Sequence, residues 1–221
     1  MTQAVSQAPQ LDSNGLRQAL RIAGGCTIGF TISKLMNWPY GIFFTVYPML
    51  LLGLVPVLNK SIVRQFLASA AISIPMVLIM QGLFSHLPVL MTIIVFLAFC
   101  FLFYQMSSGA AFLFGALGVV GLSIQLHFSS YVTGTSSVYP LILSNGLATV
   151  LSIVIAFVMH GVFPDVTARA VRAVPAKAKE SIRHEVLLCA TVATLSFVAF
   201  QVLDLQDSIS AQASSVLILF S

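Results

Sequence analysis

The sequence predicts an all-α protein, a polytopic bundle of transmembrane helices with about six N-terminal spans and the start of a second set. Of its 221 residues, 58% are hydrophobic and only 7% are charged, whereas soluble domains carry roughly 25% charged residues. The hundred residues from 65 to 164 contain no Asp, Glu, Lys or Arg. The apolar runs are continuous and lack the alternation of outer-membrane barrel strands. We therefore expect lipid, not water, around these helices.

Apolar runs near the length that crosses a bilayer, about 20 residues, recur between short turn-type breaks. The first run is the weakest, since it contains three glycines and Lys34. A last apolar run at 209–221 would begin an eighth span, and we expect the sequence to be truncated there. The complete spans are expected at 20–36, 40–58, 62–83, 87–106, 109–128, 138–163 and 185–203.

These spans divide the chain into four segments. They are a polar cytoplasmic tail at 1–15, a six-span membrane domain at 16–163, a basic cytoplasmic loop at 164–184, and the seventh span with the start of an eighth at 185–221. The tail lacks the basic and apolar regions of a cleaved signal peptide.

The basic residues predict the orientation of the chain. Nine of the ten Lys and Arg residues fall on one side of the predicted topology, and Lys34 stands alone on the other. Because cytoplasmic loops carry an excess of Lys and Arg, we expect a multi-pass membrane protein with a cytoplasmic N-terminus.

Motifs for catalysis or cofactor binding are missing from the sequence. It contains no phosphate-binding loop, no dinucleotide-binding glycine motif and no HExxH metal motif. Its three cysteines are far apart and do not have zinc-site spacing. We therefore expect no enzyme activity, no cofactor, no metal and no nucleic-acid partner. The first six spans also lack acidic residues, so they offer no buried carboxylate for a proton relay.

Polar side chains within the apolar runs are candidates for a substrate pathway. Lys34 could attract an anion near the outer end, or it could extend its amine to the headgroups. The amides could line a passage for a polar organic solute, or they could hydrogen-bond neighbouring helices. The candidate pathway residues are Lys34, Gln81, Gln105, Gln125 and Asn145.

Small residues spaced four apart are candidates for close helix packing. This spacing places them on one helix face and lets two backbones approach each other. The contact could lie within one chain or between two copies, so a homo-oligomer is one expected partner besides the bilayer. The candidate packing residues are Gly25, Gly29, Ala111, Gly115, Ala148 and Ser152.

Sequences at the helix ends resemble one superfamily. They are LRQALRIA at 16–23, WPYG at 38–41, Thr45 and Pro48 in the second span, Arg64 and Gln65 at the entry to the third, Pro88 at the opening of the fourth, and FPD at 163–165. The pattern resembles the fusaric acid resistance protein-like (FUSC-like) superfamily, which includes the aromatic acid exporters. Within it, the chain is most similar to a shorter bacterial inner-membrane subgroup, the DUF2955-like proteins.

The resemblance implies two membrane sets separated by a cytoplasmic segment. It also implies efflux of aromatic carboxylic acids together with a periplasmic adaptor of the membrane-fusion type. The segment at 164–184 is much shorter here than the cytoplasmic domain of larger members. Efflux of small aromatic or amphipathic organic acids is thus the expected function. A passive anion channel and a non-transporting membrane scaffold are the alternatives.

Overall fold

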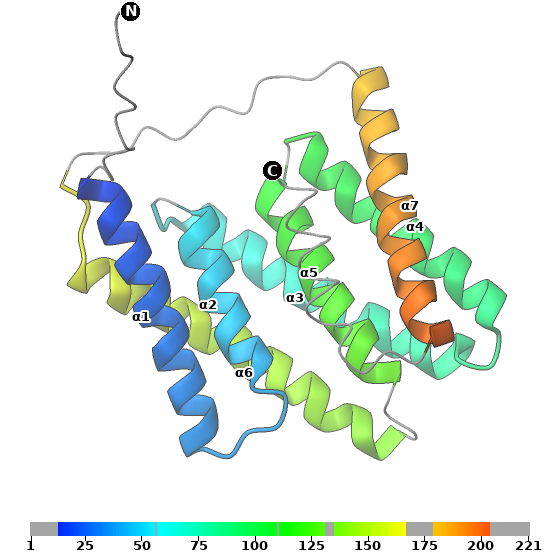
Figure 1. Ribbon diagram of the computed structural model, residues 1–221, viewed down its shortest axis with the longest axis horizontal. Helices are drawn as coiled ribbons and strands as arrows, with labels where there is room; N and C mark the ends of the chain where they lie inside the picture. The colour runs from blue at the N-terminus through cyan, green and yellow to red at the C-terminus, as the bar shows by residue number, and fades with distance from the viewer. Residues whose placement is uncertain (1–12, 56, 110, 131–134, 167–178, 204–221) are drawn as a thin grey trace, which may run out of the picture.

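The computed structural model describes residues 13–55, 57–109, 111–130, 135–166 and 179–203. The described residues form helices without any strand, which confirms the all-α class (Figure 1). The helices are α1 (Ser13–Leu35), α2 (Ile42–Leu54), α3 (Lys60–Phe84), α4 (Pro88–Ser107), α5 (Phe112–Ser130), α6 (Thr135–Val162) and α7 (Lys179–Leu203).

Local sequence explains several helix ends. The side chain of Asn59 accepts a hydrogen bond of 2.9 Å from the backbone N–H of Ile62 and so caps the start of α3. Pro88 begins α4, where its missing N–H costs nothing. Beyond α4, Gly109 has a φ of 71°, a conformation that glycine adopts without strain. Turns therefore lie where the turn-type sequences predict them.

The number of membrane spans differs from the prediction. Five helices, α3 to α7, are long and apolar enough to cross a bilayer, so the count of about six N-terminal spans is not confirmed. The predicted span 40–58 contains only the 13 residues of α2, about 20 Å of helix against a hydrocarbon core of about 30 Å. The helix ends before Val55, whose extended backbone suits a residue that precedes proline.

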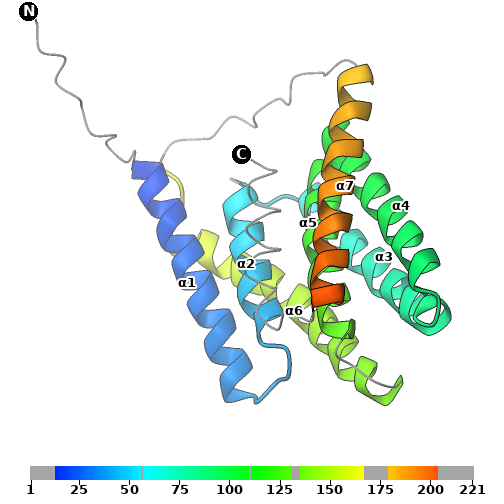
Figure 2. The same cartoon turned by 45° about the vertical axis from the view of Figure 1, so that its right-hand side comes forward.

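The helices pack in two groups, which we call the first half (α1, α2 and α6) and the second half (α3, α4, α5 and α7). Within the first half all three helices contact one another, and within the second half α5 contacts α3, α4 and α7. Figures 1 and 2 show the two groups side by side. They meet where α3 and α5 contact α6. Helix α5 is the most buried of the five long helices.

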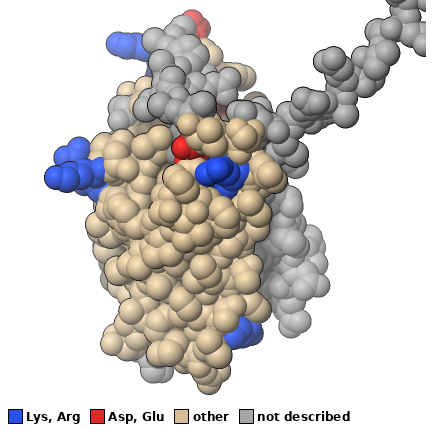
Figure 3. Space-filling view, turned by 90° about the vertical axis from the view of Figure 1, so that its left-hand side faces the viewer, with Lys and Arg blue, Asp and Glu red and all other residues tan. Residues whose placement is uncertain are grey.

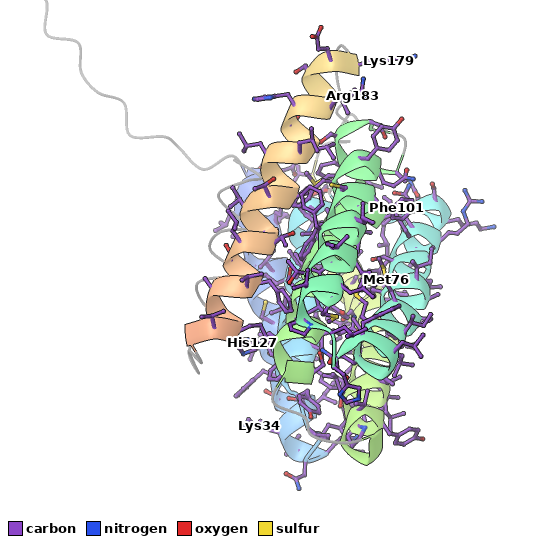
Figure 4. The ribbon with its side chains drawn as sticks, turned by 90° about the vertical axis from the view of Figure 1, so that its right-hand side faces the viewer. Lys34, Met76, Phe101, His127, Lys179 and Arg183 are labelled. Atoms are coloured by element: carbon purple, nitrogen blue, oxygen red, sulfur yellow. The ribbon has the colours of Figure 1, made fainter. Side chains whose placement is uncertain are left out.

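Basic residues of the described chain gather toward one end of the bundle. Lys179 and Arg183 lie at one end of Figure 4 and Lys34 lies near the other. A surface almost without charge separates the two ends (Figure 3). This separation matches the division of Lys and Arg that the sequence predicts.

The start of α1 is bound to the residues that follow α6. Arg21 forms an ion pair with the carboxylate of Asp165, and Arg21 is only 2% exposed. Arg17 donates a hydrogen bond of 2.6 Å to the carbonyl of Pro164. The side chain of Asn14 accepts one of 2.9 Å from the N–H of Val166. These contacts close the first half at its basic end.

Candidate functional site

A group of polar side chains lies buried where the two halves meet. Tyr47 comes from α2, Ser73 from α3, Gln125 from α5, and Asn145 and Thr149 from α6. We call these five residues the polar cluster. A buried polar group needs a hydrogen-bond partner within the protein, because burial removes the hydrogen bonds that it would otherwise form with water. The partners within this cluster are therefore informative.

Tyr47 and Asn145 form the pair of the first half. The hydroxyl of Tyr47 donates a hydrogen bond of 2.9 Å to Oδ1 of Asn145. Their exposed fractions are 3% and 0%. Thr149 lies one helical turn further along α6. Its hydroxyl donates to the backbone carbonyl of Asn145 at 2.8 Å and lies 3.4 Å from the side-chain Oδ1 of Asn145. The carbonyl side of the Asn145 amide is thus satisfied.

Gln125 and Ser73 form the pair of the second half. The Nε2 of Gln125 donates to the hydroxyl of Ser73 at 3.3 Å and to the carbonyl of Gly121 at 3.0 Å. Both side chains are buried. This pair joins α3 to α5, as the Tyr47 pair joins α2 to α6.

Gly121 brings the two pairs together. A Cβ placed on this glycine would lie 3.1 Å from the Tyr47 hydroxyl, 3.7 Å from the Ser73 hydroxyl and 3.9 Å from Nε2 of Gln125. The absence of a side chain therefore lets the two pairs share one small space. Any larger residue would force the Tyr47 hydroxyl to shift.

One strong donor of the polar cluster has no partner among the described residues. The Nδ2 of Asn145 is fully buried without a hydrogen bond. An amide nitrogen has two N–H groups to donate, and leaving them unpaired in a buried position costs about 1–3 kcal/mol. The cluster can accordingly stabilise an acceptor, such as a carboxylate oxygen, that reaches Asn145.

Aromatic rings connect the polar cluster with the start of α2. Tyr40 packs edge-on against Phe128 with ring centroids 5.0 Å apart, and Phe128 lies 6.2 Å from Phe43. Phe43 is 5.6 Å from Tyr47, which packs edge-on against Phe66 at 5.7 Å. These spacings are typical of favourable aromatic pairs. We call this set the aromatic series.

A polar stripe on α3 leads from the basic end to the cluster. Gln65, Ser69 and Ser73 are spaced four apart and therefore lie on one face. The side chain of Gln65 accepts from the N–H of Phe114 at 3.4 Å. Ser69 lies opposite Gly118, with its hydroxyl 3.5 Å from the position of an added Cβ. The stripe thus faces α5 along its length.

The structure brings together two of the five predicted pathway residues, Gln125 and Asn145. Gln81 donates instead to the hydroxyl of Ser129 at 2.6 Å. Gln105 is half-buried on α4. Lys34 is exposed, with its amine 5.5 Å from the ring centroid of Phe30. These three lie outside the polar cluster.

The predicted packing residues lie at close helix contacts within the chain. An added Cβ on Gly29 would meet the carbonyl oxygen of Phe44 at 1.9 Å, and one on Gly25 would meet Leu52 at 2.5 Å. Gly115 lies equally close to the backbone of α4. Ala148 and Ser152 are fully buried on α6, whereas Ala111 is half-buried beside the core of the second half.

Sequence reasoning missed Tyr47, Ser73 and Thr149, since each is an ordinary residue within an apolar run. It also used Arg21 as an orientation signal and as part of the LRQALRIA sequence, and did not predict that its guanidinium is buried against Asp165. The available signals were the four-residue spacing of Gln65, Ser69 and Ser73, and the tyrosine directly before Pro48.

Five long apolar helices and a largely uncharged surface define the class of protein: a multi-pass helical membrane protein. The chain belongs to the family described as Protein of unknown function (DUF2955), whose model matches residues 18–159. This confirms the resemblance to DUF2955-like proteins, and the matched range contains the whole polar cluster. No curated protein and no solved structure matches the chain.

Proposed function

We propose that this protein transports small aromatic or amphipathic organic acids out of the bacterial cytoplasm, across the inner membrane, with its N-terminus in the cytoplasm. One observation carries the proposal: the polar cluster is buried between two halves of an apolar bundle and keeps an uncommitted amide donor on Asn145. The polar stripe of α3 reaches the cluster at Ser73, and the aromatic series reaches it at Tyr47.

The chemistry of the cluster suits an aromatic acid. A carboxylate only accepts hydrogen bonds, and Asn145 has N–H groups to donate. The rings of Phe43 and Phe66 flank Tyr47 and offer apolar surface for an aromatic ring. The sequence has no Asp or Glu between residues 13 and 164, so no acidic side chain in α1 to α6 repels the anion.

Transport also requires that the buried cluster open alternately to each side. Two prolines lie beside cluster residues, Pro48 next to Tyr47 and Pro75 two residues after Ser73, and both are inside helices. A proline leaves the carbonyl four residues earlier without its helical donor and favours a bend. Pro48 and Pro75 are therefore candidate hinge positions close to the cluster.

A passive anion channel is the second candidate. The specific observation in its favour is the lack of an acidic residue between 13 and 164, which leaves no carboxylate in α1 to α6 to couple transport to a proton gradient. Current carried by an aromatic acid across a bilayer without a proton gradient would favour the channel. Uptake that stops when the gradient is collapsed would favour the coupled transporter.

The same proposal includes the superfamily and the partners of the protein. We propose membership of the fusaric acid resistance protein-like superfamily, a periplasmic adaptor of the membrane-fusion type, a homo-oligomer in the bilayer, and no enzyme activity. The scaffold alternative would place function in the basic loop and would not require the cluster. Co-purification of the full-length protein with a periplasmic adaptor tests the adaptor directly.

The decisive experiment measures transport in proteoliposomes with the full-length protein. We expect radiolabelled aromatic acids to cross faster with the wild type than in empty vesicles, and Asn145→Ala to remove most of that difference. Tyr104→Phe, at an exposed tyrosine of α4, is the control and should transport at the wild-type rate. Equal transport by wild type and Asn145→Ala would contradict the role of the cluster, and no transport of any acid in a panel would contradict the substrate class.

A further inference from the structure

We propose that a groove on the exposed side of α3 binds one anionic phospholipid, with the lipid phosphate beside Lys60 and Arg64 and an acyl chain along the helix. The groove has a volume of about 720 Å³. It lies apart from the polar cluster, and the proposal does not depend on transport. Besides the two basic residues, it is lined by Leu58, Asn59, Val63, Leu67, Ala68, Ala71 and Phe157.

The spacing of the lining residues on α3 produces a stripe with two different ends. Lys60 and Arg64 lie at its start, and the lining residues that follow on α3, Leu67, Ala68 and Ala71, are apolar. Residues spaced three and four apart share a helix face, so these side chains line one side of α3. The exposed ring of Phe157 from α6 forms the facing wall.

The length of the stripe fits one leaflet. From residue 60 to residue 71 the helix rises about 16 Å, and half of a bilayer's hydrocarbon core is about 15 Å. The small side chains of Ala68 and Ala71 leave space along this distance. A single acyl chain can therefore cover the apolar part while its headgroup stays at the basic end.

The charged end of the groove is suited to a phosphate. Lys60 and Arg64 are exposed, and the ion pair within the described residues is that of Arg21 with Asp165, so neither cation is neutralised there. Helix α3 begins at Lys60, and helix N-termini carry a partial positive charge. A soluble phosphate would use this end but would leave the apolar stripe uncovered, which favours a lipid.

The test compares lipids that differ only in headgroup charge. The full-length protein in detergent is titrated with phosphatidylglycerol or phosphatidylcholine of identical acyl chains, and bound lipid is counted by native mass spectrometry. We expect one phosphatidylglycerol to bind with clear preference. Since each basic residue near an anionic surface strengthens binding by about fivefold, K60Q/R64Q should weaken it by at least that factor.

A matched variant separates this groove from general surface charge. K179Q/R183Q also removes two exposed cations from the same end of the bundle, but from α7. We expect it to retain the lipid preference of the wild type within about twofold, because its charges lie outside the groove. Equal losses in K60Q/R64Q and K179Q/R183Q would overturn the proposal.

Filling the apolar part tests the acyl chain. Ala71→Trp leaves both cations in place and should weaken phosphatidylglycerol binding, and glycerophosphoglycerol, the headgroup without acyl chains, should not compete. Full competition by glycerophosphoglycerol, or unchanged binding to Ala71→Trp, would overturn the lipid assignment. If Ala71→Trp dissociates a dimer and leaves lipid binding unchanged, the groove binds a second copy of the chain instead of a lipid. If thermal unfolding shows that Ala71→Trp does not fold, Ala71→Leu is used in its place.

Discussion

The hydroxyl of Tyr47 lies 2.9 Å from the side-chain oxygen of Asn145, although 98 residues separate the two in sequence. Neither side chain reaches solvent. This bond uses the oxygen of the Asn145 amide, while its nitrogen is buried without a hydrogen bond among the described residues. The predicted effects of replacing cluster residues follow from this geometry.

Tyr47→Phe removes the hydroxyl and keeps the ring. We expect transport of aromatic acids to fall by about tenfold, the equivalent of one lost hydrogen bond of about 1.4 kcal/mol. Stability should change by less, because hydrogen bonds between membrane helices average about 0.6 kcal/mol. Transport rates and thermal unfolding of both Tyr47→Phe and Tyr104→Phe check this. A rate as high as that of Tyr104→Phe would remove the hydroxyl from the pathway.

Gly121→Ala places a methyl group against the cluster. Its Cβ would lie 3.1 Å from the Tyr47 hydroxyl, so we expect slower transport together with a destabilisation of about 1–3 kcal/mol from overpacking. Gly146→Ala is the control, since nothing lies within 4 Å of the added Cβ there. That variant should transport normally and be slightly more stable, because alanine favours helix over glycine. Identical behaviour of the two variants would contradict the crowded geometry.

Gly29→Ala tests the contact between α1 and α2. The added Cβ would lie 1.9 Å from the carbonyl oxygen of Phe44, a backbone atom that cannot rotate away. Pro48 cannot supply the helical donor to this carbonyl. We expect a loss of at least about 3 kcal/mol in unfolding free energy, at the upper end of overpacking effects. Gly82→Ala, with open space around its Cβ inside α3, should be slightly more stable than the wild type, as expected for Gly146→Ala. Equal denaturation midpoints for the two would show that α1 and α2 lie farther apart.

Asp165→Asn tests the ion pair at the basic end. It would leave the guanidinium of Arg21, which is 2% exposed, without its counter-charge. Removing one partner of a buried pair costs about 3–5 kcal/mol, and the 15% exposure of Asp165 places the expected effect near the lower value. Arg17→Gln, which loses one hydrogen bond to Pro164, should cost about 1 kcal/mol. An unchanged unfolding midpoint for Asp165→Asn would contradict the buried pair.

Much of the fold could be predicted from the sequence, because local hydrophobicity determines which segments are apolar helices and turn residues determine where they end. The uncharged hundred residues predicted the membrane class, and Pro88 and Gly109 marked real helix ends. The predicted length of the second span, 40–58, was wrong. Apolar residues continue past Val55, but helix α2 ends at Leu54.

The candidate site was only partly predictable, since it depends on distant pairing. Gln125 and Asn145 attract notice because amides are rare in apolar runs. Tyr47 and Ser73 gain meaning only from their partners on other helices. The same holds for Arg21, whose partner lies 144 residues away.

The division into two halves has a mechanical consequence for the cluster. The bond of Tyr47 with Asn145 lies wholly within the first half, and that of Gln125 with Ser73 lies wholly within the second. Gly121 provides contact between the two pairs without a bond. A separation of the two halves at this boundary would therefore break neither hydrogen bond, although it would have to part the apolar core that Tyr47 and Phe66 share across it.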